Sequence, residues 1–507
     1  MFQIKNYIVG RFINPVNEKF IPNVNPAVGE VYSLVPDSDE QDVELAVQAA
    51  QHAFKSWSTT PASERCRMMM RIAELIDERV DYLAAVESTD QGKPVSLSRT
   101  LDIPRAALNF KFFATAAVQF ASEANIMENG NVNYTLRQPL GVVGCISPWN
   151  LPLYLFTWKI APALASGNCV IAKPSEVTPM SAFELSKICM EAGLPDGVLN
   201  ILHGTGPKCG ATLVKHPSVK AISFTGSTRA GKEIAGVGAP MFKKLSLELG
   251  GKNPNIIFAD CLSAEALVRV QDSSDDSSLS AVEVKAGDFF ERMIQTTVKS
   301  SFENQGEICL CGSRILIEKT IYSTFRTRFI EATKQLKIGD PMQADTDIGA
   351  IASQQHFDKI LYHINLAKKE GGKILLGGNV VKVPGRCENG WFIEPTIIEG
   401  LPWNCRTNQE EIFGPIVTLM PFDTEAEAIQ LANSTEYGLS ATIWTQNLSR
   451  AHRVAAQVQS GIIWINCWLL RDLRTPFGGM KNSGVGREGG YDAMRFFTEA
   501  KNVCIKL

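Results

Sequence analysis

The chain has 507 residues, which is enough for two or three domains. Hydrophobic residues make up 45% of it and charged residues 20%, so a chain that is disordered throughout is excluded. The 50 Lys and Arg against 53 Asp and Glu leave a net charge of -3, and no long basic run is present. We expect neither a nucleic-acid partner nor a membrane partner, because both usually require a basic patch.

The cysteines and the first residues indicate a reducing compartment. The chain has 12 cysteines and no CxxC pair, so neither a disulfide scaffold nor a zinc or thioredoxin-like motif is predicted. The N-terminal segment MFQIKNYIVGRF lacks the charged head and apolar stretch of a secretory signal. The sequence therefore predicts a cytoplasmic enzyme without a bound metal.

Apolar residues follow helical spacing early in the chain. Residues 42–54 and 62–86 place Val, Leu, Ile and Ala at that spacing with charges between them, which predicts two amphipathic helices. Within residues 123–136, polar and apolar side chains instead alternate on both sides of the sequence Glu-Asn-Gly-Asn at 128–131. This pattern predicts a hairpin arm.

Residues 138–158 carry no charge and have about the length of a bilayer span. They include Pro139, Pro148, Asn150 and Pro152, which would break a helix and leave backbone groups unpaired in lipid. We therefore expect a buried strand, a loop and the start of a helix instead.

Short apolar runs alternate with helical stretches from this point onward. A helical segment at 179–192 separates two of the runs, and this rhythm predicts a parallel α/β sheet. A second α/β block is expected over 253–466, with strands near 314–318 and 416–421. The runs of the first block are 142–146, 170–172, 198–202 and 221–224.

Three polar residues could carry chemistry. Cys309 follows an Asn/Gly turn, and a thiolate exposed at a cleft there would attack carbonyl carbon, whereas an inert core cysteine is the alternative. Glu248 lies in an apolar stretch, where burial would make it a base near neutral pH; a solvent-facing glutamate is the alternative. The amide of Asn150 could stabilise an oxyanion, although the segment taken alone favours an asparagine that shapes a turn.

Two strand ends could bind a dinucleotide although no GxGxxG motif is present. Residues 224–227 (FTGS) precede a helical stretch whose backbone N–H groups could hold a pyrophosphate. Residues 172–176 (AKPSE) end in Glu176, whose carboxylate could accept from a ribose hydroxyl and repel a 2′-phosphate. An ordinary strand-to-helix turn is the alternative for both.

Taken together and in this order, these segments resemble the aldehyde dehydrogenase superfamily over nearly the whole chain. The motifs that carry the resemblance are SPWN (147–150), AKPSE (172–176), FTGS (224–227), LELGGKNP (247–254), FENQGEIC (302–309), EEIFGP (410–415) and PFGGMKNSGVGREGG (476–490).

The resemblance implies an α/β fold in three parts. Residues 1–120 and 140–250 would form a Rossmann-like NAD-binding domain, and residues 251–468 an α/β catalytic domain. Residues 121–139 and 486–507 would form a β-hairpin oligomerisation arm. Because a lone hairpin is marginally stable, the arm would pair with a neighbouring subunit in a homodimer or homotetramer.

The resemblance also implies roles for the polar residues. Cys309 would attack the aldehyde to give a thiohemiacetal, while Asn150 and the backbone N–H of Cys309 form the oxyanion hole. Loss of hydride to NAD would leave a thioester, and Glu248 would activate the water that hydrolyses it. Glu176 indicates NAD rather than NADP. The positions that match cofactor contacts are Trp149, Lys173, Ser175, Glu176, Gly226, Ser227, Glu411 and Phe413.

Two further segments narrow the resemblance. Residues 98–105 (SRTLDIPR) and 466–473 (NCWLLRDL) are similar to the 2-aminomuconic and 2-hydroxymuconic semialdehyde dehydrogenases of tryptophan and aromatic-ring catabolism. The substrates of those enzymes carry a carboxylate remote from the aldehyde. The resemblance therefore implies oxidation of 2-aminomuconic 6-semialdehyde to 2-aminomuconate.

Arginine side chains suit such a substrate, because their planar fork binds a carboxylate through two hydrogen bonds. We expect Arg105 and Arg471 to bind the remote carboxylate, with Arg474 as a weaker substitute for Arg471. Surface arginines that pair with Asp102 or Asp472 are the alternative.

One feature departs from the family pattern. Glu248 and Cys309 are 61 positions apart, more than in the family, and the surplus falls on residues 262–288, which contain the tract QDSSDDSS. This composition predicts a mobile surface insertion, and we expect deletion of residues 263–288 to leave activity the same or higher. A regulatory acidic loop, an inactive isoform and a faulty gene model are the alternatives.

Other functions stay open at this point. A dehydrogenase of a neutral aldehyde, such as retinal or an aliphatic aldehyde, would use the same sulfur chemistry. A thioester hydrolase would need only Cys309 and Glu248. A non-catalytic protein that keeps the fold is the third alternative.

Overall fold

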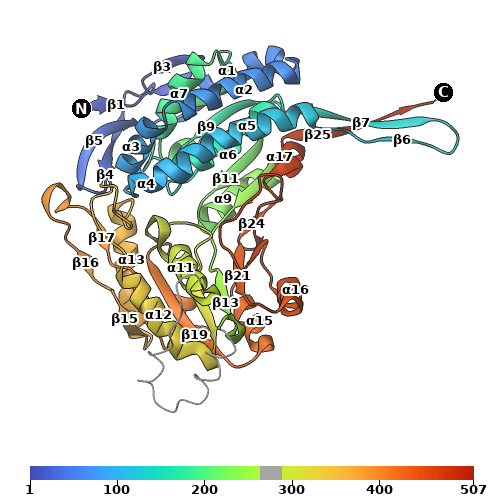
Figure 1. The fold of residues 1–507 in the computed structure, drawn as a ribbon. Helices are drawn as coiled ribbons and strands as arrows, with labels where there is room; N and C mark the ends of the chain where they lie inside the picture. The colour runs from blue at the N-terminus through green and yellow to red at the C-terminus, as the bar shows by residue number, and fades with distance from the viewer. Residues whose placement is uncertain (263–287, 507) are drawn as a thin grey trace.

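The computed structural model describes residues 1–262 and 288–506. Within them, two large sheets covered by helices form the two halves of the molecule, and a narrow arm projects from one half (Figure 1). The first sheet has the order β24-β12-β11-β8-β9-β10-β2-β3. Its strands are β24 (Gly484–Val485), β12 (Lys244–Glu248), β11 (Val219–Thr225), β8 (Val142–Ile146), β9 (Cys169–Lys173), β10 (Leu199–Ile201), β2 (Asn6–Ile8) and β3 (Arg11–Ile13).

Five central strands of this sheet are parallel. The chain proceeds outward from β8 through β9 and β10, then crosses to β11 and continues outward to β12. The order of the strands therefore reverses between β8 and β11. In open α/β sheets, ligands bind outside the carboxyl ends of the strands at such a reversal.

Helices of the first half follow from apolar periodicity and from their caps. Residues 42–54 lie within α1 (Glu40–Trp57), whose first turn is closed by a capping box between Asp39 and Asp42. The expected helix at 62–86 is two helices, α2 (Ala62–Asp77) and α3 (Val80–Gln91). The break falls at Arg79, whose backbone leaves helical geometry at φ −118° and ψ 21°.

The uncharged stretch at 138–158 folds as expected. It forms β8, a loop and the first half of α6 (Pro152–Ala165), and every residue of this helix is buried. α6 packs against α5 (Ile103–Gln119), which in turn packs against α2. The expected helix at 179–192 is α7 (Met180–Glu191). Among the described residues, none of the helices combines the length and apolar character that a membrane crossing needs.

The second sheet has the order β15-β18-β19-β14-β13-β21-β22, parallel except for β15. The expected strand at 314–318 is β14, and the one at 416–421 is β19. The strands are β15 (Lys373–Leu376), β18 (Thr396–Glu399), β19 (Ile416–Phe422), β14 (Arg314–Glu318), β13 (Pro254–Ile257), β21 (Ser440–Trp444) and β22 (Ile462–Ile465). The helices around it include α11 (Phe289–Phe302), α12 (Tyr322–Lys334), α13 (Gln354–Lys369), α15 (Glu425–Asn433) and α16 (Leu448–Gln457).

Smaller sheets complete the two halves. The three-stranded one near the N-terminus pairs β1 and β4 with the two edges of β5. These elements are β1 (Phe2–Gln3), β5 (Glu30–Pro36) and β4 (Phe20–Asn25), and two short ladders pair β16 (Val380–Val381) with β17 (Phe392–Ile393) and β20 (Tyr437–Gly438) with β23 (Met480–Lys481).

The arm contains the expected hairpin, β6 (Ala124–Ile126) and β7 (Val132–Pro139). β25 (Thr498–Ile505) pairs along the whole of β7, so the projecting element has three strands (Figure 1). The preceding helix, α17 (Gly490–Phe496), contacts α5 and α6 instead. The part of 486–507 that joins the arm is therefore β25, and the expected domain limits stay predictions.

The acidic tract predicted as a mobile insertion lies outside the described residues. Its flanks are described: Leu262 is buried, and Asp288 caps α11 by accepting a hydrogen bond from the backbone N–H of Phe289.

Candidate active site

Predicted site residues lie at the carboxyl ends of four neighbouring parallel strands. Lys173 ends β9, Trp149 and Asn150 follow β8, Ser227 follows β11, and Glu248 ends β12. The register aligns these ends, because Ile146 of β8 pairs with Lys173 and Thr225 of β11 pairs with Glu248. The reversal of strand order thus brings together residues from distant parts of the sequence.

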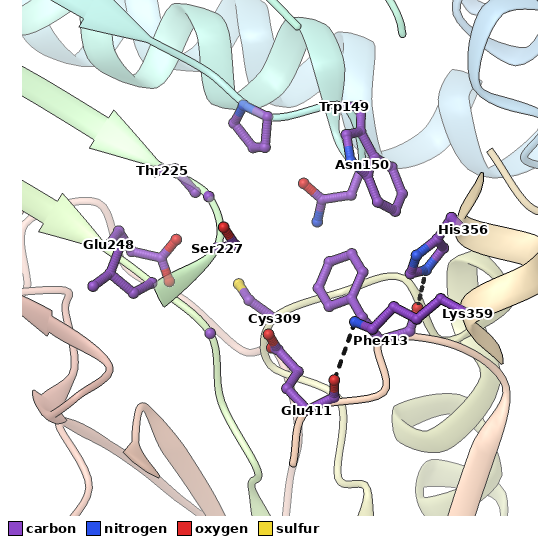
Figure 2. A pocket seen from close by; sticks show the side chains of 14 residues that line it. Trp149, Asn150, Thr225, Ser227, Glu248, Cys309, His356, Lys359, Glu411 and Phe413 are labelled. Atoms are coloured by element: carbon purple, nitrogen blue, oxygen red, sulfur yellow. Dashed lines mark hydrogen bonds between the residues drawn. The ribbon is translucent and has the colours of Figure 1, made fainter. Parts of the chain in front are cut away.

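A cavity at this edge is shared with loops of the second half (Figure 2). It also contains three side chains that the sequence analysis did not single out, namely Thr225, His356 and Lys359. Thr225 belongs to the FTGS motif but was given no role of its own, whereas no local motif marks His356 and Lys359, which reach the cavity from α13. The predicted residues that line it are Trp149, Asn150, Gly226, Ser227, Glu248, Cys309, Glu411 and Phe413.

The loop before Cys309 has an unusual backbone. Asn304, Gln305 and Gly306 have φ values of 54°, 55° and 71°, in the left-handed region that non-glycine residues rarely adopt. A Cβ at Gly306 would lie 2.3 Å from the carbonyl oxygen of Gly414, so only glycine fits this approach. The Asn253 amide donates to the carbonyl of Cys309 at 2.7 Å. These contacts hold the half-buried sulfur at the cavity wall.

Cys309 and Glu248 lie in a low-polarity environment. Burial, followed by the charge of Glu488, raises the pKa of Glu248 to about 8. Burial and the neighbouring Glu248 carboxylate raise the pKa of the Cys309 thiol well above its usual range. Within the described residues, Glu248 Oε1 is buried without a hydrogen-bond partner. This oxygen is therefore free to accept a proton or orient a water.

The Asn150 side chain is fixed on one side and available on the other. Its Nδ2 donates a hydrogen bond of 2.9 Å to the carbonyl oxygen of Glu307. An amide nitrogen has two N–H bonds, so a second donor is left for a ligand in the cavity. Asn150 is 3% exposed, and a buried donor of this kind stabilises developing negative charge strongly.

Aromatic rings and a histidine form the opposite wall of the cavity (Figure 2). His356 Nε2 lies 2.5 Å from the carbonyl oxygen of Phe413, whose φ of 65° is left-handed. The ring of Trp149 lies 4.9 Å from His356 and 5.4 Å from Phe413, centroid to centroid. Burial lowers the pKa of His356 to about 3, so this residue is a neutral ring at physiological pH.

Glu411 joins the loop at Gly251 to helix α13. Its Oε1 accepts from the backbone N–H of Gly251 at 2.8 Å, and its carbonyl oxygen accepts from Lys359 at 3.1 Å. Burial raises the pKa of the Glu411 carboxyl.

Lys173, Ser175 and Glu176 lie at the same sheet edge, but outside the set of residues that line this cavity. Lys173 Nζ donates to Glu176 Oε2 at 3.1 Å. Burial is the largest influence and would raise the pKa of Glu176, but the charge of Lys173 and the hydrogen bonds that Glu176 accepts together outweigh it, so the net shift is downward. Glu176 is therefore an ionised acceptor. The Ser175 hydroxyl accepts from the backbone N–H of Val177 at 3.2 Å.

The start of α9 (Thr228–Gly238) supplies a site for an anion. Ser227 caps this helix by accepting from the backbone N–H of Ala230, and both Gly226 and Ser227 line the cavity. Free N–H groups and the helix dipole favour negative charge there. Together with the Glu176 carboxylate and the aromatic wall, this donor set fits a dinucleotide.

A second cavity lies on the other side of the sulfur and shares Cys309 and Glu248 with the first. Arg105 and Arg471 both line it, together with Tyr154 and several leucines. Arg471 Nη1 donates to the Tyr154 hydroxyl at 2.7 Å, while its Nη2 is buried without a partner among the described residues. Arg471 therefore lines the cavity that contains the thiol, and one of its donors has no partner within the described part of the chain.

The alternative pairing of these arginines with nearby aspartates is wrong. Asp102 forms its ion pair with buried Lys93, and Asp472 forms its ion pair with Arg474. Arg471 instead stacks between aromatic rings, 3.7 Å from the centroid of Phe477. The side chain of Arg474, the weaker candidate, is 80% exposed and does not line the cavity.

Comparison with known proteins agrees with this geometry. The sequence profile described as the aldehyde dehydrogenase family matches residues 12–274 and 279–503. This chain therefore belongs to the aldehyde dehydrogenase family, and the predicted family and fold class are confirmed.

Individual relatives show which members of the family this chain is similar to. A 2-aminomuconic semialdehyde dehydrogenase of Danio rerio is 48% identical over 506 residues, 99% of this chain and 98% of that protein. A 2-hydroxymuconic semialdehyde dehydrogenase of Pseudomonas sp. (strain CF600) is 43% identical and covers 100% of both chains. The crystal structure of an indole-3-acetaldehyde dehydrogenase in complex with NAD+ matches with a TM-score of 0.92 and 35% identity, over 100% of this chain and 97% of that one.

Proposed function

We propose that this chain is an NAD-dependent dehydrogenase that oxidises 2-aminomuconic 6-semialdehyde to 2-aminomuconate. The main support is Arg471, which lines the cavity that also contains the Cys309 thiol and whose Nη2 has no partner among the residues that the structure describes. A buried guanidinium next to a nucleophile suits an aldehyde with a carboxylate at its far end. The named relatives act on substrates of this kind.

The first step is addition of the Cys309 sulfur to the aldehyde carbon, which forms a thiohemiacetal. The thiol must lose its proton, and the Glu248 carboxylate is the base beside it. The carbonyl oxygen gains negative charge as the C–S bond forms. The free N–H of Asn150 and the backbone N–H of Cys309 stabilise that charge.

NAD would be held by Trp149, Lys173, Ser175, Glu176, Gly226, Ser227, Glu411 and Phe413 and would supply the hydride acceptor that turns the thiohemiacetal into a thioester. Glu248 first releases the thiol proton to solvent, so that its carboxylate can then deprotonate the water that attacks the thioester carbon. The C–S bond breaks, the acid leaves, and the Cys309 thiol is restored. The raised pKa of Glu248 suits both proton transfers, because it lies near neutral pH.

The arm supports the further proposal of a homodimer or homotetramer. It projects from the first half (Figure 1). Its strands carry exposed apolar side chains, among them Ile126 on β6, Leu136 on β7 and Ile505 on β25. Exposed strands with apolar side chains usually mark a contact with another chain. The cytoplasmic location stays a prediction from the sequence.

The decisive experiment follows NADH absorbance with 2-aminomuconic or 2-hydroxymuconic semialdehyde as substrate. Retinal and an aliphatic aldehyde serve as neutral comparisons. We expect NADH from the wild-type enzyme, preference for the carboxylated aldehydes, and no NADH from Cys309→Ser. Thioester hydrolysis without NADH would favour the hydrolase alternative, and equal turnover of all aldehydes would contradict the proposed substrate.

A further inference from the structure

Three ionisable side chains lie together in the interior beside the Asn150 loop. Lys93, Glu87 and Asp102 all have fully buried side chains. Lys93 Nζ is hydrogen-bonded to Asp102 Oδ2 and lies 3.8 Å from Glu87 Oε1. Glu87 belongs to α3, Lys93 follows that helix, and Asp102 ends a helical turn, η1 (Ser98–Asp102).

This cluster binds the Asn150 loop at two points. Lys93 Nζ donates to the carbonyl oxygen of Asn150 at 2.9 Å. Glu87 Oε2 accepts from the backbone N–H of Leu153 at 3.0 Å, in the first turn of α6. The Asn304 amide adds a second hydrogen bond to the carbonyl oxygen of Asn150, at 3.0 Å. Both ends of the loop are thus tied to buried polar side chains.

Stability alone is a weak reason for such a cluster. The free energy lost when charges leave water is often larger than the attraction that a buried ion pair gains. Apolar residues in its place often leave the protein equally stable. Burial, followed by the charge of Asp102, raises the pKa of Glu87, which favours its protonated form. The hydrogen bonds of the cluster to the Asn150 loop instead make it a fixed scaffold in the interior.

We propose that Lys93 is a positioning residue for the Asn150 amide, with Asp102 orienting the Lys93 ammonium. The inference rests on the proposed function, in which Asn150 stabilises the oxyanion. Fixing the Asn150 carbonyl fixes the peptide plane that begins at its Cα and so restricts the directions open to the Cα–Cβ bond. The hydrogen bond to the backbone carbonyl of Glu307 holds the far end of the Asn150 side chain, so its free N–H points in one direction. A displacement of about 1 Å at such a donor can cost on the order of 100-fold in rate.

A double-mutant cycle tests this role. Lys93→Met, Asn150→Ala and the double variant are mixed rapidly with NAD and 2-hydroxymuconic semialdehyde, and the rate of the first NADH burst is measured. We expect Lys93→Met to slow the burst at least about 10-fold in the wild-type background. In the Asn150→Ala background, the same change should alter the burst less than about twofold, because the group that Lys93 positions is gone. Equal effects in both backgrounds would overturn the proposal.

Lys243 offers a matched control. It is also buried, and it donates to the backbone carbonyls of His216 and Val219, away from both cavities. Lys243→Met should change the burst rate less than about twofold in either background, even where it lowers the midpoint of thermal unfolding. A burst slowed as much as by Lys93→Met would show that loss of any buried lysine has this effect and would overturn the proposal.

Removing Lys93 leaves a buried carboxylate uncompensated, which can prevent folding. The same cycle is then run with Lys93→Met/Asp102→Asn, in which the cation and its partner charge are both removed. A fold-change in burst rate that is the same with Asn150 and with Asn150→Ala would overturn the proposal for this variant too. Failure of the proposed function is a separate result, because the wild-type enzyme would then form no NADH at all.

Discussion

The Asn150 amide donates a hydrogen bond of 2.9 Å to the backbone carbonyl of Glu307, two residues before Cys309. This bond joins the loop after β8 to the loop that presents the sulfur. The separation of donor and nucleophile is therefore set largely by backbone contacts. A carbonyl carbon that approaches the sulfur brings its oxygen toward a donor that is already in place, so little reorganisation accompanies the reaction.

Asn150→Ala removes this donor while the fold around it keeps its other contacts. We expect kcat to fall by about 10²–10³, because a lost oxyanion donor has this effect in other acyl-transfer enzymes. KM for the aldehyde should change much less, since the lost interaction belongs to the transition state. Steady-state NADH assays measure both constants, and a kcat within about threefold of wild type would contradict the role of Asn150.

The rate of thioester hydrolysis should depend on the ionisation of Glu248. Its pKa is raised to about 8, so below that pH most molecules hold a protonated carboxyl that cannot act as a base. We expect the steady-state rate to rise as pH increases from 6.5 to 9, with a midpoint near 8. Stopped-flow and steady-state NADH assays over this range separate the burst from turnover.

Glu248→Gln is the control for that pH profile. The glutamine keeps the shape of the side chain but cannot take a proton from water. We expect the rise with pH to disappear and turnover to fall by about 10²–10⁴, the range for a lost general base. A variant that keeps the wild-type pH profile would show that another group, such as the Cys309 thiol, controls hydrolysis.

Much of the fold was predictable because its strands are continuous apolar runs. β8 and β14 have the predicted bounds, since each is a buried run with turn residues on both sides. The helix break at Arg79 was missed, because apolar spacing continues across it and neither Gly nor Pro marks it. Tertiary packing of α2 and α3 decides that boundary.

The site was predictable where strand order places motifs at one sheet edge. His356 and Lys93 were missed because their partners are distant in the sequence. His356 contacts Phe413 and Lys93 contacts Asn150, and each pair is 57 positions apart. The sequence favoured Arg471 over Arg474 through its resemblance to the family, but spacing alone does not separate two arginines on either side of Asp472. The structure separates them by burial, which sequence spacing does not reveal.

The preference for NAD over NADP should depend on Glu176. Its ionised carboxylate would accept from ribose hydroxyls and repel a 2′-phosphate, while Lys173 beside it would attract that phosphate. We expect Glu176→Gln to lower the ratio of kcat/KM for NAD to that for NADP by about 10–100-fold, the equivalent of one charge-assisted interaction. Glu184→Gln is the control, because Glu184 also pairs with a lysine three residues away but lies on α7. An unchanged ratio in Glu176→Gln would contradict the assignment.

Arg471, and not Arg474, should bind the carboxylate that distinguishes charged from neutral aldehyde substrates. Arg471→Ala removes a buried donor beside the thiol, so we expect KM for 2-hydroxymuconic semialdehyde to rise about 10–100-fold, as for one lost charge-assisted hydrogen bond. KM for an aliphatic aldehyde should change little, because it has no carboxylate. Arg474→Ala is the control, since this exposed side chain pairs with Asp472. If Arg471→Ala raises KM equally for both aldehydes, or if Arg474→Ala has the same effect, then Arg471 shapes the cavity but does not bind the carboxylate.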